Sequence, residues 1–256
     1  MKKSLQLLRT AAAALAVAAI APMAASAQNL PPAQEIIDRY VEAIGGREAA
    51  LQQVATRTTG TFSMPSMGVT GELEVVTGEN DEMATRVVIP GMGEMLTGYT
   101  GEVAWSMDPM MGARLLDGME LEAMKEQAEP LYGVRDASLF TSFETVGEAE
   151  YDGDACWEIA YVWVSGRETT ECYSKETGYV IAQTSMQETP MGEVESMTRF
   201  SNYQQFGDLM VPTEMRQSAM GQEQVMTIDN VEMGSAVDTA LLSPPAAILT
   251  LINAGG

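Results

Sequence analysis

Histidine is absent from this sequence, and its absence removes whole classes of chemistry. None of the 256 residues can supply an imidazole as a general base, a proton shuttle or a zinc ligand. The Ser-His-Asp and Cys-His arrangements of common hydrolases are therefore excluded. Carboxylate-only catalysis remains open, because 36 residues are Asp or Glu. No pair of them stands out, so a carboxylate-dependent envelope hydrolase ranks last among the alternatives, and the chain is not expected to be an enzyme.

Basic residues are also scarce. The sequence holds 14 Lys and Arg against 36 Asp and Glu, which gives a formal net charge of −22. Nucleic acids and anionic lipid headgroups bind clustered Lys and Arg, so neither is an expected partner. The sequence also lacks the phosphate-cradling Gly-x-x-x-x-Gly-Lys motif and a dinucleotide-binding fingerprint. No cofactor is expected.

The apolar run near the N-terminus is too short to cross a bilayer. Lys2, Lys3 and Arg9 precede the apolar stretch 11–21, and the small residues Ala25-Ser26-Ala27 follow it. A transmembrane helix needs about 20 apolar residues, whereas this layout is that of a cleavable secretory signal peptide. We expect residues 1–27 to be removed and residues 28–256 to form a single domain in the periplasm, without stable membrane insertion.

Only two cysteines are present, Cys156 and Cys172. An even pair on adjacent strands of an exported protein is typically a disulfide. A two-residue turn at Ser165-Gly166 would place Cys156 opposite Lys175, so the bond requires a bulge or a longer loop. Because the pair lacks C-x-x-C spacing, a structural disulfide is favoured over a redox-active one.

Hydrophobic periodicity predicts one helix followed by many short strands. The face of this helix is formed by Ile36, Ile37, Tyr40, Val41 and Ile44, between two prolines and two glycines. From Thr56 onward, stretches rich in Val, Thr, Tyr and Met are separated by glycine-bearing turns, which is typical of consecutive antiparallel strands. One helical interruption is expected near residues 119–128. The pattern therefore predicts a mainly β, α+β protein.

A large antiparallel sheet with one to three short helices must still bury one of its faces. A sheet that curves around the helices achieves this, and its interior is a natural apolar cavity. The short C-terminal tail, residues 246–256, begins with an apolar run after Pro244-Pro245. We expect this tail to dock on the body, and we take closure of the cavity mouth as a hypothesis.

Methionine is frequent, with 20 in the chain. Several fall in Met-x-x-Met spacing, namely Met64/Met67, Met92/Met95 and Met107/Met110 with Met111. Thioethers suit Cu(I), so a methionine-based Cu(I)-binding periplasmic protein is the alternative function. Methionine more often lines adaptable apolar surfaces, and this spacing does not converge on a strand, so no metal site is predicted. The candidate cavity residues are Trp105, Trp157, Trp163, Met64, Met67, Met92, Met95 and Met107.

Several segments carry a family resemblance. They are 36–46, 99–109, Gly147 with 151–153, 173–178 and 203–212. In these segments the chain resembles the outer membrane lipoprotein-sorting protein group, which shares the fold of the lipoprotein carrier LolA and its receptor LolB. The resemblance implies a strongly curved antiparallel sheet that forms an unclosed half-barrel, with helices on its concave side and a cavity for acyl chains. A cavity arginine helps to govern release in the carriers, but no motif aligns Arg57 or Arg86 with it.

The expected function is that of a periplasmic binding or carrier protein for a hydrophobic ligand. A lipid or a lipoprotein acyl chain fits the cavity that the resemblance implies. A role in outer membrane biogenesis, with an envelope protein as a partner, follows from the same resemblance.

Overall fold

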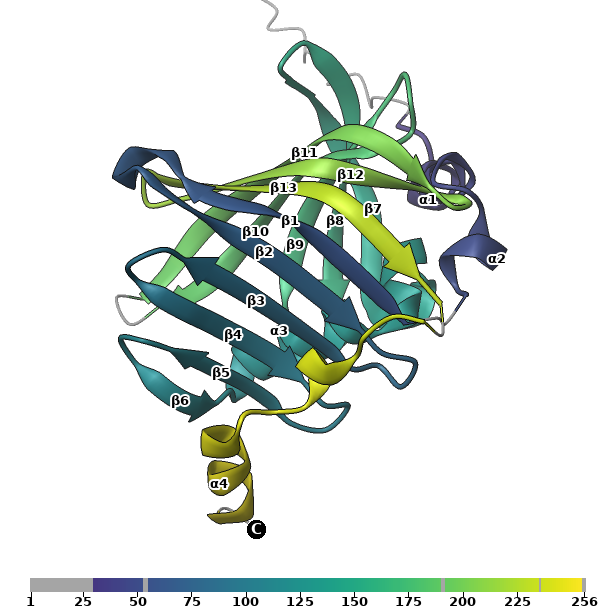
Figure 1. Ribbon diagram of the computed structural model, residues 1–256. Helices are drawn as coiled ribbons and strands as arrows, with labels where there is room; N and C mark the ends of the chain where they lie inside the picture. The colour runs from purple at the N-terminus through teal and green to yellow at the C-terminus, as the bar shows by residue number, and fades with distance from the viewer. Residues whose placement is uncertain (1–29, 53–54, 190–191, 235, 255–256) are drawn as a thin grey trace, which may run out of the picture.

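In the part of the chain that the computed structural model describes, thirteen antiparallel strands form one continuous sheet (Figure 1). The structure describes residues 30–52, 55–189, 192–234 and 236–254, so the predicted signal peptide lies outside the described residues. The sheet consists of two meanders, β1 to β6 and β7 to β13, which join where β1 pairs with β13. Strands β6 and β7 are its outer strands, and the sheet is not closed. The predicted unclosed, mainly β architecture is confirmed.

The strands follow the predicted turns closely. The first meander contains β1 (Thr56–Met64), β2 (Val69–Thr77), β3 (Met83–Ile89), β4 (Gly93–Tyr99), β5 (Ala104–Asp108) and β6 (Gly112–Leu115). The second contains β7 (Phe140–Tyr151), β8 (Asp154–Trp163), β9 (Glu168–Ser174), β10 (Val180–Thr189), β11 (Gly192–Phe206), β12 (Leu209–Ala219) and β13 (Gln222–Met233).

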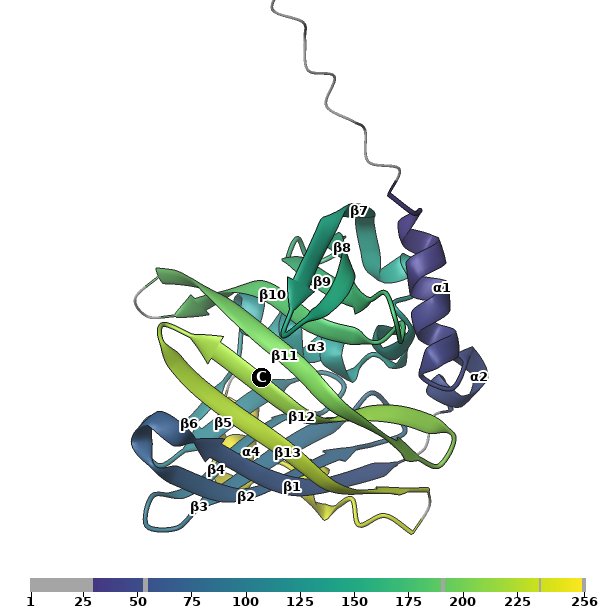
Figure 2. The same ribbon diagram turned by 90° about the horizontal axis from the view of Figure 1, so that it is seen from above.

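Short helices precede, connect and follow the two meanders. The α-helices are α1 (Ala33–Ala43), α2 (Arg47–Ala50), α3 (Gly118–Ala128) and α4 (Ala246–Ala254). Single 3-10 turns occur at η1 (Pro65–Met67), η2 (Pro130–Val134), η3 (Ala137–Leu139) and η4 (Ala240–Leu242). Seen from above, the two meanders curve around α3 (Figure 2). No helix in the described part of the chain combines the length and the apolar character needed to cross a membrane.

Helix α1 covers the concave face of β7 to β9. Its residues Ile36, Ile37 and Tyr40 are buried against the alternating large side chains of β8, as the strand pattern predicts. The rings of Tyr40 and Tyr173 meet edge to face, with centroids 5.6 Å apart. This packing places the N-terminal helix inside the curve of the second meander.

Helix α3 covers the concave face of the first meander. Its residues Leu121 and Met124 pack against Tyr99 and Ala104, which lie opposite each other on β4 and β5. Because successive side chains of a strand alternate between faces, the neighbouring Trp105 points to the convex face. The sheet therefore carries helices on its concave side, as expected.

The C-terminal helix α4 packs on the convex face. Ile248 is fully buried there against Trp105 and Leu96, and α4 contacts β5 and β6. The prediction that the tail docks on the body is confirmed. The hypothesis that it closes the mouth of the cavity is wrong, because it lies on the face opposite to α3.

Candidate functional site

A hollow lies between the concave face of the sheet and the helical segment α2, α3 and η2. It has three lobes, with volumes of about 630 Å³, 390 Å³ and 190 Å³. Tyr132 and Gln127 line both larger lobes, and Phe200 lines the largest and the smallest. The lobes therefore share walls. Cavities of about 300–1,000 Å³ are typical of small-molecule sites.

Methionine side chains from both meanders and from α3 line the largest lobe. They come from β3, α3, β10, β12 and β13, and they are Met83, Met119, Met186, Met215 and Met226. Phe200, Ala123 and Tyr132 complete much of the apolar wall. Unbranched thioether side chains adapt to irregular apolar ligands. None of these five methionines is among the candidate cavity residues named from the sequence.

Several polar side chains of the largest lobe have partners within the protein. Gln217 donates from Nε2 to Ser196 Oγ at 3.0 Å, and Arg167 donates from Nε to Glu126 Oε2 at 2.7 Å. A buried polar group that already has a hydrogen-bond partner in the protein contributes little to binding a ligand. These two side chains are engaged within the protein, and the methionines with Phe200 supply the apolar part of the wall.

A buried ion pair lies at the inner end of the hollow. Arg135 lines the smallest lobe and lies next to Glu171, which is fully buried on β9. The Arg135 Nη2 to Glu171 Oε1 distance is 2.8 Å, and Nε to Oε2 is also 2.8 Å. Tyr173 donates from its hydroxyl to Oε2 at 2.6 Å, and Gln183 donates to Oε1 at 2.8 Å. Each carboxylate oxygen of Glu171 thus accepts hydrogen bonds.

Burial and charge set the protonation of this network. Burial acts to lower the pKa of Arg135, but the combined attraction of Glu171 and of the nearby tyrosines outweighs it, and the pKa lies well above its ordinary value. Burial raises the pKa of Tyr161 and of Tyr173 well above the ordinary phenol value. Arg135 therefore stays charged and the two phenols stay protonated. The network holds the helical segment against the sheet and offers no free base.

No pattern in the sequence marks Arg135 as a site residue. It follows η2 in a left-handed backbone conformation, at φ 51°, outside any periodic pattern. By contrast, the two strand arginines considered from sequence, Arg57 and Arg86, both pair with Glu74, which belongs to the convex face. The buried arginine beside the hollow comes from a connecting segment rather than from a strand.

The three candidate tryptophans lie in different environments. Trp163 is buried under Tyr132, whose ring stacks on it at 5.5 Å between centroids. Trp157 lies beside α1, with Lys175 Nζ 3.7 Å from its ring centroid. Trp105 is covered by α4 on the convex face. The structure does not bring these rings together in the hollow.

The candidate methionines are divided between the interior and the solvent. Met64 and Met95 pack against one concave apolar cluster with Phe62, whereas Met67 and Met92 are exposed at turns. Met107 packs under α4 on the convex face. In each Met-x-x-Met pair, one thioether packs against an apolar cluster and the other is exposed to solvent. The two sulfur atoms of a pair therefore do not point to a common site.

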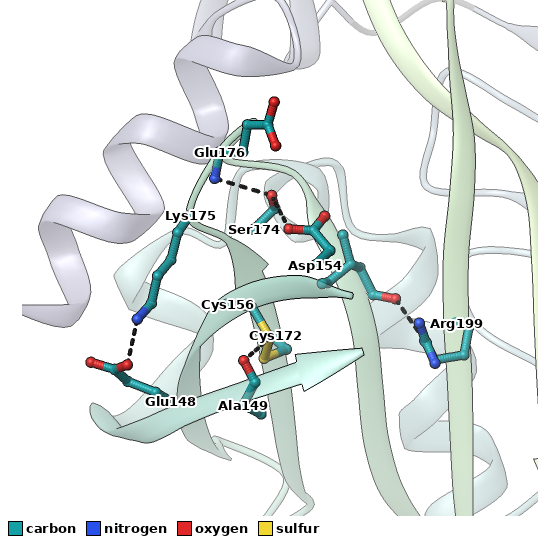
Figure 3. Close-up of a disulfide and its surroundings, with 10 residues drawn as sticks. Glu148, Ala149, Asp154, Cys156, Cys172, Ser174, Lys175, Glu176 and Arg199 are labelled. Atoms are coloured by element: carbon teal, nitrogen blue, oxygen red, sulfur yellow. Dashed lines mark hydrogen bonds and ion pairs between the residues drawn. A yellow bond between two sulfur atoms is a disulfide. The ribbon is translucent and has the colours of Figure 1, made fainter. Parts of the chain in front are cut away.

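The two cysteines are bonded across β8 and β9 (Figure 3). Their Cα atoms are 5.5 Å apart, although Cys156 lies opposite Ser174 rather than Cys172. Trp163 and Arg167 close the hairpin through a backbone hydrogen bond, so its loop is one residue longer than a two-residue turn. That shift makes the cysteines a diagonal pair, which confirms the predicted disulfide and the need for a longer loop.

Comparison with known proteins supports the fold. No protein-family profile and no curated protein sequence matches the chain. Among solved structures, a DUF1329 family protein from Desulfovibrio piger is similar with a TM-score of 0.57 and 14% identity, covering 84% of this chain and 99% of its own. A LolA superfamily protein from Nitrosomonas europaea gives a TM-score of 0.54 at 11% identity, covering 84% and 98%.

A third structure extends the comparison to the group suggested by the sequence. It is a putative outer membrane lipoprotein-sorting protein domain from Vibrio parahaemolyticus, with a TM-score of 0.50, 11% identity, and coverage of 82% of this chain and 97% of its own. Identities this low speak to architecture alone. In its fold, the chain is similar to the LolA superfamily and the outer membrane lipoprotein-sorting proteins.

Proposed function

We propose that this protein binds a hydrophobic ligand, such as a lipid or a lipoprotein acyl chain, in the hollow of its half-barrel and carries it through the periplasm. The observation that carries the proposal is the methionine-lined lobe of about 630 Å³ between α3 and the sheet. An apolar ligand gains roughly 25 cal/mol for each Å² of apolar surface removed from water. Partners that deliver or accept the ligand belong to the envelope.

The lining supports carriage of a ligand rather than reaction with it. The carboxylate of Glu171 is fully engaged by hydrogen bonds, and the phenols of Tyr161 and Tyr173 stay protonated. Thioethers and aromatic rings provide contact without fixed direction. Such a wall accepts chains of different shape, as a carrier requires.

The first test is native mass spectrometry of protein taken from a bacterial periplasm, followed by solvent extraction of any adduct. We expect an apolar molecule at one per protein that rebinds after extraction. A protein that is isolated empty and also ignores added fatty acids and phospholipids would contradict the proposal.

A variant pair tests the location of binding. Ala123 lines the largest lobe from α3, so Ala123→Trp places an indole inside the hollow. Val146 is exposed on β7, so Val146→Trp adds the same ring on the outside. We expect Ala123→Trp to weaken uptake of a fluorescent fatty acid and Val146→Trp to leave it unchanged. Equal uptake by both variants would place the ligand elsewhere.

A further inference from the structure

Three hairpin turns of the first meander share the sequence Pro-x-Met-Gly. They are Pro65–Gly68 between β1 and β2, Pro90–Gly93 between β3 and β4, and Pro109–Gly112 between β5 and β6. Because antiparallel neighbours alternate in direction, these turns lie at one end of the sheet. The Met220-Gly221 turn between β12 and β13 joins them there, since Ser66 Oγ donates to Gln222 Oε1 at 3.0 Å. This end lies at the left of Figure 1, away from α1 and α2.

The methionines at these turns project into solvent. Their exposed fractions run from 49% at Met92 to 90% at Met110, with Met67, Met111 and Met220 between these values. Glycines with positive φ, such as Gly68 at 65° and Gly112 at 76°, close the turns tightly. Turn tips normally carry Gly, Asn, Asp, Ser or Pro. Exposed methionine at four neighbouring turns therefore forms a distinct surface, which we call the methionine rim.

The four turns of the rim carry no charged residue, although the protein as a whole is strongly acidic. Asp108 accepts from the backbone of its own turn, and Glu94 and Glu223 lie near Arg86 and Arg216, whereas Glu193 and Glu195 are exposed on the neighbouring strand β11. The opposite end carries exposed acids on its turns, namely Glu79, Asp81, Glu102, Asp152 and Asp208. The turns of the rim thus carry fewer acidic residues than the turns at the opposite end.

We propose that the methionine rim docks on the surface of a lipid bilayer, with the acidic end pointing away from it. Apolar side chains inserted at the headgroup boundary bind a protein to the interface through buried apolar area. The rim supplies five separated thioether tips, without the aromatic and Arg anchors that specific protein interfaces favour. Because the four turns of the rim carry no charged residue, they are the turns that anionic lipid headgroups repel least.

Docking by the rim would also bring the hollow to the bilayer. Gln217 and Met226 flank the Met220-Gly221 turn on β12 and β13, and both line the largest lobe. A protein seated on these turns presents the neighbouring part of the hollow to the lipid. The surface itself is separate from the hollow, so docking can be tested whether or not the hollow binds a ligand.

The test uses the chain from Gln28 to Gly256, which contains every described residue. Vesicles of phosphatidylcholine, alone or with phosphatidylglycerol, are floated with the protein through a density gradient. We expect binding to phosphatidylcholine vesicles, and weaker binding at low salt when the anionic lipid is added. Substituting serine for the five rim methionines should weaken binding by about tenfold or more, since one fully buried methionine contributes roughly that factor.

A matched pair of reporters locates the contact even if the five-site variant fails to fold. Met110→Trp places an indole on the rim, and Glu102→Trp places one on the β4–β5 turn at the opposite end of the sheet, outside the hollow. Brominated phosphatidylcholine should quench the added emission of Met110→Trp and leave that of Glu102→Trp unchanged. The proposal is overturned if no vesicle binds, if both reporters are quenched equally, or if sedimentation shows the rim buried in a dimer.

Discussion

The buried pair of Arg135 and Glu171 gives the sharpest prediction for stability. Glu171→Gln keeps the shape of the side chain but removes the charge that balances Arg135. Arg135 is 7% exposed and Glu171 is fully buried, so solvent cannot replace the lost partner. Breaking a buried pair from one side costs about 3–5 kcal/mol, because one charge is left uncompensated.

The expected change is large enough to measure by thermal unfolding. For a domain of this size, about 1 kcal/mol shifts Tm by roughly 2–4 °C, so Glu171→Gln should lower Tm by about 6–20 °C. The control is Glu120→Gln, which removes the same charge from the exposed bidentate pair of Glu120 with Arg114. Exposed pairs contribute about 0–1 kcal/mol, so the control should stay close to the parent protein.

A double variant then separates loss of charge balance from loss of packing. Arg135→Met with Glu171→Leu removes both charges, and such replacements are often close to neutral. The double variant should recover only part of the stability lost in Glu171→Gln, because the hydroxyl of Tyr173 and the amide of Gln183 lose their acceptor. Urea unfolding should give a coupling free energy between the two positions of about 2 kcal/mol or more. If Glu171→Gln were no more destabilising than Glu120→Gln, this account of the network would be refuted.

Three further predictions follow from other contacts. Replacing both Cys156 and Cys172 with serine should lower the free energy of unfolding in urea by about 2–4 kcal/mol, and reducing the disulfide of the parent protein should lower it by the same amount. Hydrogen bonds from Ser138, and then Arg47, lower the pKa of Asp136 to about 2, so Asp136→Ala should cost roughly 1 kcal/mol near neutrality. That difference should shrink as pH falls from about 4 through 2, and a constant difference would contradict it. Deletion after Pro245 should expose Trp105 and red-shift its emission, with ligand uptake unchanged.

Local patterns predicted most of the fold because each one depends on near neighbours. The apolar face of α1 follows from its helical spacing, and the alternation along β8 gives the inward row from Trp157 to Trp163. Glycine-bearing turns located the strand ends. The closing contact between β1 and β13 joins distant parts of the chain, and no local pattern reveals it.

The site was harder to predict than the fold. Which methionines face the hollow depends on sheet curvature and on where α3 lies, so Met215 and Met226 had no distinguishing local signal. The apolar tail had the correct character for docking, but composition cannot tell a concave from a convex face. Trp105 packs against α4 on the convex face and lies next to Gly98. A Cβ atom at position 98 would lie 2.5 Å from the Trp105 ring.

The Met-x-x-Met spacing, which is the basis of the Cu(I)-binding alternative, is explained by where these methionines lie in the hairpins. In a hairpin, the last inward residue of the strand and the tip of the turn lie about three residues apart, so one thioether packs inside and the next reaches solvent. Met64 with Met67 and Met95 with Met92 both follow this rule. We therefore expect Cu(I) uptake under reducing conditions to be equal in the parent protein and in a variant with leucine at these four positions. Lower uptake by the variant would revive a metal-binding role for these turns.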